Sequence, residues 1–182
     1  MNKKLPKIIN KEEFEQLFTA IYNKEKRSKG VKKAKLKKYR VAVLLGFEAG
    51  LRISEIVGYK DKVPPLDKPN VDDVSIRIEN AKGGKDRIVP RPKRFNDAAK
   101  SMLPLNISRR ALQRFIKQAG KRYLDKDIHF HTLRHSFGTH LANQNRPLHE
   151  IQMLMGHNKL ETTGIYLHAS PDHAIREARD TF

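Results

Sequence analysis

The sequence predicts a mainly α-helical fold with one small antiparallel β-sheet. Most apolar residues recur at the three- and four-residue spacing of amphipathic helices, and only two short stretches rich in β-branched residues flank a Gly-Gly turn. The length of 182 residues is about that of one domain and is enough for a sizeable hydrophobic core. We therefore expect a single domain over residues 1–182, without disulfide support because the chain has no cysteine.

The first predicted helix runs from Asn10 to Ile21. Asn10 is a residue type that caps helices, and Glu13 stands three residues later, as in a capping box. The apolar residues of this segment recur at helical spacing, at Phe14, Leu17, Phe18 and Ile21. An amphipathic helix with a defined start is therefore expected.

A strongly basic segment follows, at residues 23–40. It holds ten Lys or Arg and one acidic residue on either side of Ser28 and Gly30, and we predict that the whole segment is a basic loop that leads into the next helix. Such a segment is either a solvated surface run or a contact with a polyanion. We favour the polyanion contact, because so many like charges without a partner would repel one another.

Gly50 separates the next two predicted helices. Residues 41–48 are nearly all apolar, which indicates a buried helix that Gly50 ends. Residues 51–58 are predicted to form a short second helix with Ser54 as a candidate cap. Residues 59–70 contain three prolines and are predicted to be a loop.

One β-hairpin is predicted, from residues 71–78 and 87–89. β-branched residues alternate or cluster in both segments, and the Gly83-Gly84 pair between them is a turn signal. No strand is expected after this hairpin. Residues 90–104 are predicted to be a basic connector.

Helices are expected over most of the remaining chain. Ser108 is expected to cap one helix, Thr132 to open the next, and Pro147 to begin a third that stops at the following glycine. Two short helices are expected at residues 162–167 and from residue 170 onward.

The chain is strongly basic, with 38 Lys or Arg, 20 Asp or Glu and a formal net charge of +18. This charge exceeds what solubility requires, so a polyanionic partner is expected, and nucleic acid is the leading candidate. An anionic membrane is the weaker alternative, because the longest apolar run, residues 41–47, is far too short to span a bilayer and no signal peptide is recognisable. We therefore expect a cytoplasmic protein that contacts no membrane.

Six residues carry side chains suited to chemistry on a phosphate: Arg52, Lys82, His131, Arg134, His157 and Tyr166. Taken singly, each has an ordinary explanation, such as a surface ion pair with Glu55, an exposed turn lysine, a helix cap or a core aromatic. His129 and His131 could indicate metal ligands, but Arg134, one helical turn further on, would repel a cation. We predict no metal and no cofactor.

Together the six residues describe a site for a phosphodiester attacked by a protein nucleophile. Negative charge builds up on the non-bridging oxygens in the transition state, and the planar guanidinium groups of Arg52 and Arg134 can each grip two oxygens. Tyr166 offers a hydroxyl nucleophile, and Lys82 offers a proton for the leaving oxygen. Because a tyrosine has an ordinary pKa of about 10, its attack needs the base or cations that the neighbouring histidines and arginines could supply.

Five motifs occur in order along the chain: AGLRISE (49–55), AKGGKDRIVP (81–90), HTLRHSFGTH (131–140), MGH (155–157) and TTGIY (162–166). Their order and spacing, including the nine residues from His157 to Tyr166, resemble the catalytic domain of tyrosine recombinases, the phage-integrase and Xer group. The resemblance covers nearly the whole chain. It implies the catalytic fold of the DNA breaking-rejoining enzymes.

The resemblance also implies roles in DNA strand exchange. Tyr166 would form a 3′-phosphotyrosyl bond, Lys82 would protonate the leaving 5′-oxygen, and His131 would assist proton transfer. Glu55 matches an acidic position that is expected to support Arg52. The scissile phosphate would be held by Arg52, Arg134 and His157.

The resemblance implies two kinds of partner, double-stranded DNA and further copies of the chain. The chain would be a monomer when free and a tetramer in the synapse. Family members usually carry an N-terminal core-binding domain, whereas this chain begins at about the first helix of the catalytic domain. We therefore expect a catalytic domain without the core-binding domain. The alternative is a DNA-binding accessory protein with the same fold and little catalysis, but all six catalytic positions are intact, which favours the enzyme. The basic residues expected to contact DNA are Lys29, Lys32, Lys33, Lys35, Lys37, Lys38, Lys85 and Arg87.

Overall fold

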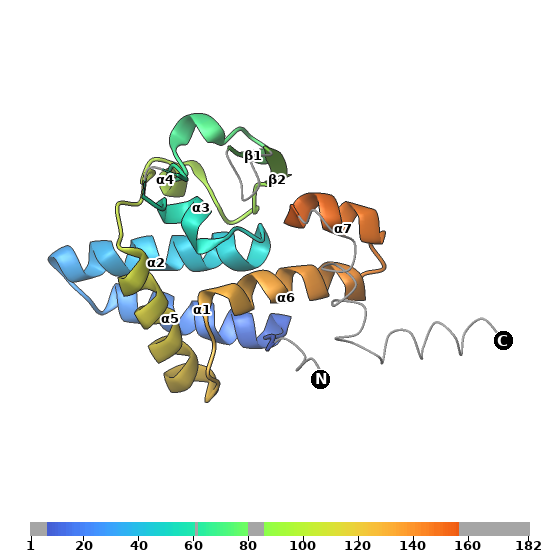
Figure 1. Cartoon of the computed structure of the whole chain (residues 1–182). Helices are drawn as coiled ribbons and strands as arrows, with labels where there is room; N and C mark the ends of the chain where they lie inside the picture. Colours follow the sequence, from blue (N-terminus) through green and yellow to red (C-terminus); the bar gives the residue numbers. More distant parts are fainter. Residues whose placement is uncertain (1–6, 61, 80–85, 157–182) are drawn as a thin grey trace.

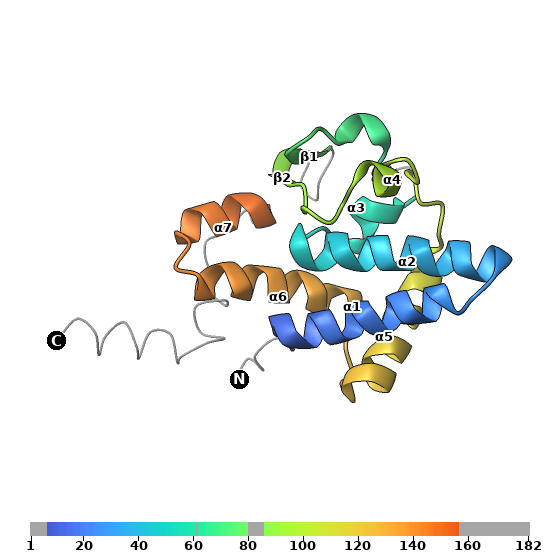
Figure 2. The same cartoon turned by 180° about the vertical axis from the view of Figure 1, so that it is seen from behind.

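The computed structural model describes residues 7–60, 62–79 and 86–156 (Figure 1 and Figure 2). Its longer helices are α1, Lys11–Lys26; α2, Gly30–Glu48; α5, Arg109–Leu124; α6, Phe130–Asn143; and α7, Leu148–Met155. The shorter elements are α3, Ile53–Val57; the 3-10 helix η1, Lys68–Asn70; the strands β1, Ser75–Ile78, and β2, Arg87–Pro90; and α4, Asp97–Lys100. The fold is mainly α with one small antiparallel sheet, as the sequence predicts.

Helix α2 lies at the centre of the fold. Helix α1 packs along it in the opposite direction, α6 also packs against it, and α3, α4 and the β-hairpin lie on its other side (Figure 1). Residues 41–47 of α2 are buried, and the ring of Phe47 stacks on Phe14 of α1 with 3.9 Å between the ring centroids. Burial of this apolar surface is the main stabilising contribution, and it fixes the end of α2 at which the site begins.

Two predicted helix starts are confirmed. The side chain of Asn10 accepts a hydrogen bond from the backbone of Glu13 at 2.8 Å, and the Glu13 carboxylate accepts one from the backbone of Asn10 at 3.0 Å, which completes the capping box of α1. The Ser108 hydroxyl accepts a hydrogen bond from the backbone of Ala111 at the start of α5. Both helices begin where local hydrogen-bond acceptors satisfy their first amide groups.

The basic segment is helical, so the predicted loop over residues 23–40 is wrong except for the short connection between α1 and α2. Helix α1 continues to Lys26, and α2 begins at Gly30. Lysine has a good helix propensity, and Leu36 and Tyr39, three residues apart, bury one face of this segment. The lysines are therefore displayed on a rigid helix.

The predicted cap at Ser54 is also wrong. Gly50 follows the end of α2 with a φ of +64°, and the chain then turns directly into α3, with Arg52 at the N-cap position. The Glu55 carboxylate accepts a hydrogen bond from the backbone of Arg52 at 2.7 Å. A carboxylate at the third position of the helix thus takes the place of the expected hydroxyl cap, and Ser54 lies inside α3.

The antiparallel strand pair of the predicted hairpin is confirmed, with a first strand shorter than predicted, and the predicted Gly83-Gly84 turn lies outside the described residues. Strands β1 and β2 pair in antiparallel register, with Ile78 opposite Arg87. Strand β1 begins at Ser75 and not at residue 71, because the Asp72 carboxylate accepts a hydrogen bond from the backbone of Ser75 at 2.6 Å and holds a local turn.

The connector over residues 90–104 contains helix α4, which the sequence analysis did not predict. The side chain of Asn96 accepts a hydrogen bond from the backbone of Ala99 at 3.0 Å and caps this helix. Helix α6 begins at Phe130 and not at the predicted Thr132, because the Thr132 hydroxyl accepts a hydrogen bond from the backbone of the preceding N-cap residue, at 3.2 Å.

Helix α7 begins after Pro147 and stops at Gly156, as predicted. It is held on α6 by a small apolar cluster of Phe137, Ile151 and Met155. The predicted short helices at residues 162–167 and from residue 170 lie outside the described residues. Within the described ranges, no helix is long and apolar enough to cross a membrane.

Candidate active site at the end of helix α7

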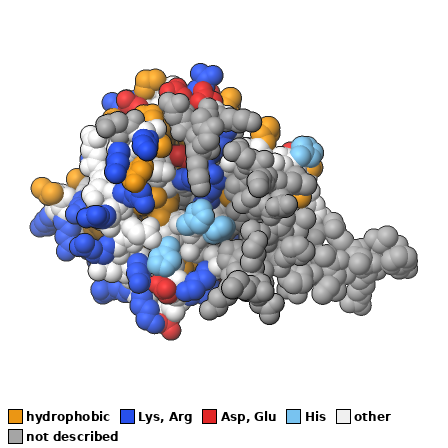
Figure 3. All heavy atoms as spheres, viewed as in Figure 1, with side chains coloured by type: hydrophobic (Ala, Val, Ile, Leu, Met, Phe, Trp, Pro, Cys, Tyr) orange, Lys and Arg blue, Asp and Glu red, His pale blue; other side chains and the backbone are white. Residues whose placement is uncertain are grey.

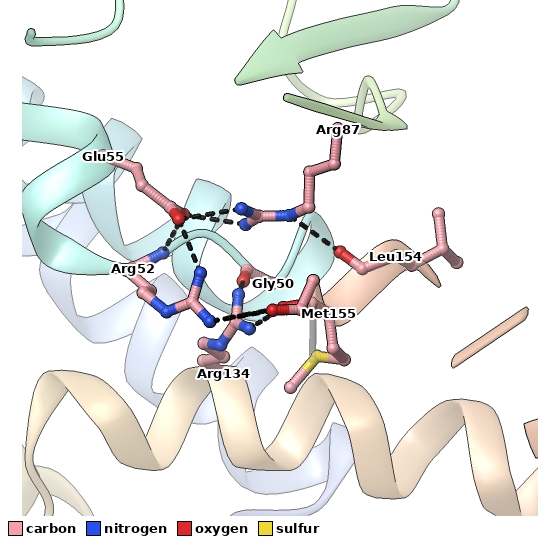
Figure 4. Close-up of polar contacts among 8 residues, drawn as sticks. Gly50, Arg52, Glu55, Arg87, Arg134, Leu154 and Met155 are labelled. Carbon is pink, nitrogen blue, oxygen red and sulfur yellow. Dashed lines mark hydrogen bonds and ion pairs between the residues drawn. The ribbon is translucent and has the colours of Figure 1, made fainter. Parts of the chain in front are cut away.

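Three arginines from three different elements meet at the carboxyl end of α7 (Figure 4). Arg52 precedes α3, Arg87 begins β2, and Arg134 lies on the buried face of α6. Each guanidinium donates a hydrogen bond to at least one of the last backbone carbonyls of this helix end. Carbonyls at a helix C-terminus have no partner within the helix and carry partial negative charge, so cationic donors stabilise them.

Arg134 is almost completely buried, with an exposed fraction of 1%. Its Nη1 donates to the carbonyl of Gly50 at 2.5 Å, and its Nη2 donates to the carbonyl of Met155. Gly50 has a positive φ of +64°, and a Cβ there would lie 2.4 Å from the Phe137 ring. Only glycine fits this position, so Gly50 both ends α2 and presents the carbonyl that fixes Arg134.

Arg52 is less deeply buried, with 18% of its side chain exposed. Its Nη2 lies 3.5 Å from the carbonyl oxygen of Met155 and 3.3 Å from that of Gly156. The guanidinium groups of Arg52 and Arg134 therefore converge on the Met155 carbonyl. Two planar cations converging in this way are suited to binding the oxygens of one phosphate.

The carboxylate of Glu55 is shared by two of the arginines. Glu55 Oε1 accepts from Arg52 Nη1 at 2.8 Å and from Arg87 Nη1 at 2.8 Å. Glu55 Oε2 accepts from the backbone of Arg52 at 2.7 Å and from Arg87 Nη2 at 2.8 Å. The pairing of Arg52 with Glu55 is thus part of a buried network, and the simple surface ion pair considered for it is wrong.

These contacts determine the protonation of Glu55. Burial alone raises the pKa of this carboxyl, but the hydrogen bonds and charge of Arg87, followed by the charge and backbone amide of Arg52, lower the pKa from 4.5 to about 2. Glu55 is therefore ionised at any pH near neutrality. Three guanidinium groups and one carboxylate leave an excess of positive charge, which an anionic ligand would balance.

His131 and His135 lie one turn apart on α6, with 4.2 Å between their ring centroids. His131 is exposed and His135 is partly buried. Burial, and then the charges of His131 and Arg134, lower the pKa of His135 from 6.5 to about 4. Near neutrality His135 is therefore uncharged.

The structure brings together four of the residues discussed as candidates: Arg52, Glu55, Arg87 and Arg134. His131 lies on α6 one turn before Arg134, at an exposed position, whereas the Arg134 side chain is buried. Four other candidates lie outside the described residues: Lys82, Lys85, His157 and Tyr166.

The position of Arg87 in the structure argues against the expected contact of this residue with DNA. Its side chain is only 5% exposed and is turned inward onto Glu55. Strand alternation could have indicated this, because Arg87 lies two residues from the buried Val89 and shares its face. His135 was also missed, although its position four residues after His131 was a visible signal.

The described lysines expected to contact DNA lie near the start of α2. Most are exposed, and Lys38 is partly buried. Figure 3 shows Lys and Arg side chains gathered at the end of the molecule where α2 begins in Figure 1. These lysines are Lys29, Lys32, Lys33, Lys35, Lys37 and Lys38. No group of three or more His, Cys, Asp or Glu that could hold a metal ion occurs among the described residues.

The lowered pKa values of His135 and Glu55 predict how these two groups make stability depend on pH. For both groups the folded-state pKa lies below the unfolded one, so each contribution is complete above the unfolded pKa and is lost as the pH falls through the folded pKa. We expect the free energy of unfolding to fall from about pH 6.5 toward 4 because of His135, and from about pH 4.5 toward 2 because of Glu55.

Urea denaturation at a series of pH values measures this dependence. His135→Gln should reduce the slope of the free energy of unfolding against pH between about pH 6.5 and 4. Glu55→Gln should reduce that slope between about pH 4.5 and 2. Unchanged slopes in these variants would contradict the two assignments.

Comparison with known proteins shows the family of the chain. The phage integrase family matches residues 7–173. The chain is 30% identical over 188 residues to a tyrosine recombinase of Thermosipho africanus, a match that covers 93% of this chain and 60% of that protein. It is 31% identical over 194 residues to tyrosine recombinase XerA of Thermococcus kodakarensis, covering 97% of this chain and 62% of that protein.

Solved structures show the same fold. The crystal structure of XerA recombinase matches with a TM-score of 0.73 and 22% identity, over 98% of this chain and 66% of that one. The catalytic domain of bacteriophage HP1 integrase matches with a TM-score of 0.65 and 21% identity, over 96% of this chain and 94% of that one. Because the phage integrase family matches residues 7–173, the chain belongs to that family. It spans less than two thirds of the length of the two curated relatives.

Proposed function

We propose that the chain is the catalytic part of a site-specific recombinase that cleaves and rejoins duplex DNA. The observation that carries this proposal is the convergence of Arg52 and Arg134 on the Met155 carbonyl, two residues before His157. Membership of the phage integrase family supports this reaction, and Tyr166, nine residues after His157 in the sequence, is the proposed nucleophile.

In the proposed reaction, the hydroxyl oxygen of Tyr166 attacks the scissile phosphorus. A 3′-phosphotyrosyl bond forms, the bond from phosphorus to the 5′-oxygen breaks, and Lys82 gives that oxygen a proton. The proton of Tyr166 passes to a base, the role proposed for His131. Because one phosphoester replaces another, a 5′-hydroxyl of the same or another DNA strand can reverse the step and rejoin the DNA.

Arg52, Arg134 and His157 would stabilise the charge that develops on the non-bridging oxygens. Guanidinium groups held in place beforehand need no reorganisation during the reaction, which is the most effective form of electrostatic stabilisation. The proposed chemistry requires no metal, because these cations and Lys82 take the roles of charge neutraliser and acid. We infer that the protein acts in the cytoplasm, on chromosomal or mobile-element DNA.

Assembly on DNA is part of the proposal. A solved relative is described as a XerH recombinase bound to palindromic difH substrate in a post-cleavage complex, and another as a lambda integrase dimer bound to a COC′ core site. We infer that four copies of the chain would assemble around two DNA duplexes in the synapse.

The proposal is tested by trapping the covalent intermediate. The protein is incubated, in buffer containing EDTA, with a pool of nicked duplexes of random sequence, in which a short cleaved fragment diffuses away. Denaturing gels are expected to show a protein–DNA adduct, and sequencing the attached DNA would define the preferred site. Binding to these duplexes without an adduct would favour the accessory-protein alternative.

The start of α2 is expected to contact the DNA backbone. From Lys33 to Glu48 the helix rises by about 22 Å, so we expect the lysines at its start to contact phosphates at some distance from the scissile one. Replacing Lys32, Lys33, Lys35 and Lys37 by Gln should therefore reduce the slope of log affinity against log salt by about 3 to 4.

The control replaces Lys121 and Lys126, which pair with Asp125 and Glu13. Since these lysines are engaged with carboxylates, their replacement by Gln should change the slope by less than about 1. An unchanged salt slope in the α2 variant would show that these lysines do not contact DNA and form an ordinary solvated surface.

A further inference from the structure

Arg87 is a buried cation that links three parts of the candidate site. It begins strand β2, its two terminal nitrogens bind both oxygens of Glu55 at 2.8 Å, and its Nε donates to the carbonyl of Leu154 at 3.0 Å. Its side chain is 5% exposed. The hairpin, the start of α3 and the end of α7 are therefore joined through one guanidinium (Figure 4).

The fit around Arg87 is close. Gly156 has a φ of +57°, and a Cβ at this position would lie 2.9 Å from Arg87 Cδ. Glycine thus allows both the left-handed turn that ends α7 and the approach of the Arg87 side chain. The residue that follows is His157, so the same contact also sets where the chain leaves α7.

Glu55 has its hydrogen-bonding capacity filled by two arginines. A carboxylate offers about four acceptor positions, and Arg52 and Arg87 each occupy two of them. The three charges sum to +1: two guanidinium groups and one carboxylate. Without Arg87, the carboxylate would neutralise Arg52, and little positive charge from this group would remain for a phosphate.

We propose that Arg87 is a positioning residue, which neutralises and orients Glu55 so that Arg52 keeps both its geometry and its charge for the scissile phosphate. The inference rests on the proposed function and deepens it. Arg87 acts through Glu55 and does not touch DNA. A lysine would keep the charge, but it could not bind both carboxylate oxygens in one plane.

A double-mutant cycle tests this assignment. Arg87→Met lowers the summed charge of the three groups to 0, Glu55→Gln raises it to +2, and the double variant restores +1. We expect Arg87→Met to slow adduct formation on the nicked duplex pool, at saturating protein, by about tenfold or more. Adding Glu55→Gln to that variant should restore most of the lost rate, a rescue that a purely structural role of Arg87 does not predict.

Two controls separate rate from binding. DNA affinity, measured with each variant in a Tyr166→Phe background, should change by less than about threefold, because Arg87 makes no DNA contact. Arg77→Met removes an exposed arginine from the neighbouring strand β1 and should leave the cleavage rate unchanged.

The outcomes distinguish this inference from the proposed function. If the wild-type chain forms no adduct, the proposed function fails and this inference with it. If the wild type reacts but the double variant is slower than Arg87→Met, Arg87 does not act through Glu55. Should Arg87→Met fail to fold, the double variant, which buries no uncompensated carboxylate, is compared with the wild type: a rate within about tenfold supports the inference, and a loss beyond about 100-fold overturns it.

Discussion

Replacing Tyr166 by Phe is expected to abolish the covalent protein–DNA adduct while leaving DNA affinity nearly unchanged. The substitution removes one oxygen atom, and that oxygen is the proposed nucleophile, for which the remaining ring has no substitute. DNA affinity depends on many phosphate contacts, so one hydroxyl contributes little to it. Denaturing gels measure the adduct, and a binding titration at fixed salt measures affinity.

The matched control is Tyr59→Phe, a change of the same size at a side chain that is 40% exposed. This variant should form adduct at the wild-type rate. An adduct that persists in Tyr166→Phe would contradict the assignment, and mass spectrometry of the attached peptide would then identify the residue that carries the DNA. Loss of DNA binding in Tyr166→Phe would point to a structural role instead.

Much of the helical framework could be predicted from the sequence, because its signals are local. Asn10 with Glu13, and Ser108, cap their helices through hydrogen bonds within the first turn. The basic segment was misjudged because charge density was weighed above periodicity. Leu36 and Tyr39 are buried on one face of α2, and their three-residue spacing was the signal of a helix in this segment.

The predicted start of α3 was wrong for a different reason. Ser54 has the usual residue type of a cap, but Glu55 also forms a bond to the Arg52 backbone and a buried pair with Arg87. Arg87 lies far away in the sequence, so no local pattern contains this contact. The hydrogen bond between Glu55 and the Arg52 backbone is local, and the distant ion pair with Arg87 holds the same carboxylate in place, so capping statistics describe only part of what starts this helix.

The candidate site shows the same division between local and distant information. The motifs identified Arg52, Glu55 and Arg134, because the residue types and their order are visible in the chain. They did not show that all three arginines of the cluster contact the end of α7. Arg87 was assigned to DNA on its charge alone, whereas its place beside Val89 on the inner face of β2 decides its role.

Replacing Arg134 by Ala is expected to slow adduct formation by about 100- to 1,000-fold, the scale for removal of one preorganised donor from an active site. The guanidinium is fixed between the carbonyls of Gly50 and Met155, so its charge is in place before the reaction begins. Alanine removes that charge and also leaves both carbonyls without this donor. Single-turnover cleavage of the nicked duplexes at saturating protein measures the effect on rate.

Arg134→Lys separates charge from geometry at the same position. Lysine keeps the positive charge, but its single nitrogen cannot imitate the planar fork between the two carbonyls, so a loss of at least about tenfold is still expected. Arg114→Ala, an exposed change on α5, serves as the surface control and should leave the cleavage rate unchanged. If Arg134→Ala weakens only DNA affinity, and its rate at saturation equals that of the control, then Arg134 positions the DNA without stabilising the transition state, and the charge that develops on the phosphate must be balanced by Arg52 and by residues beyond α7.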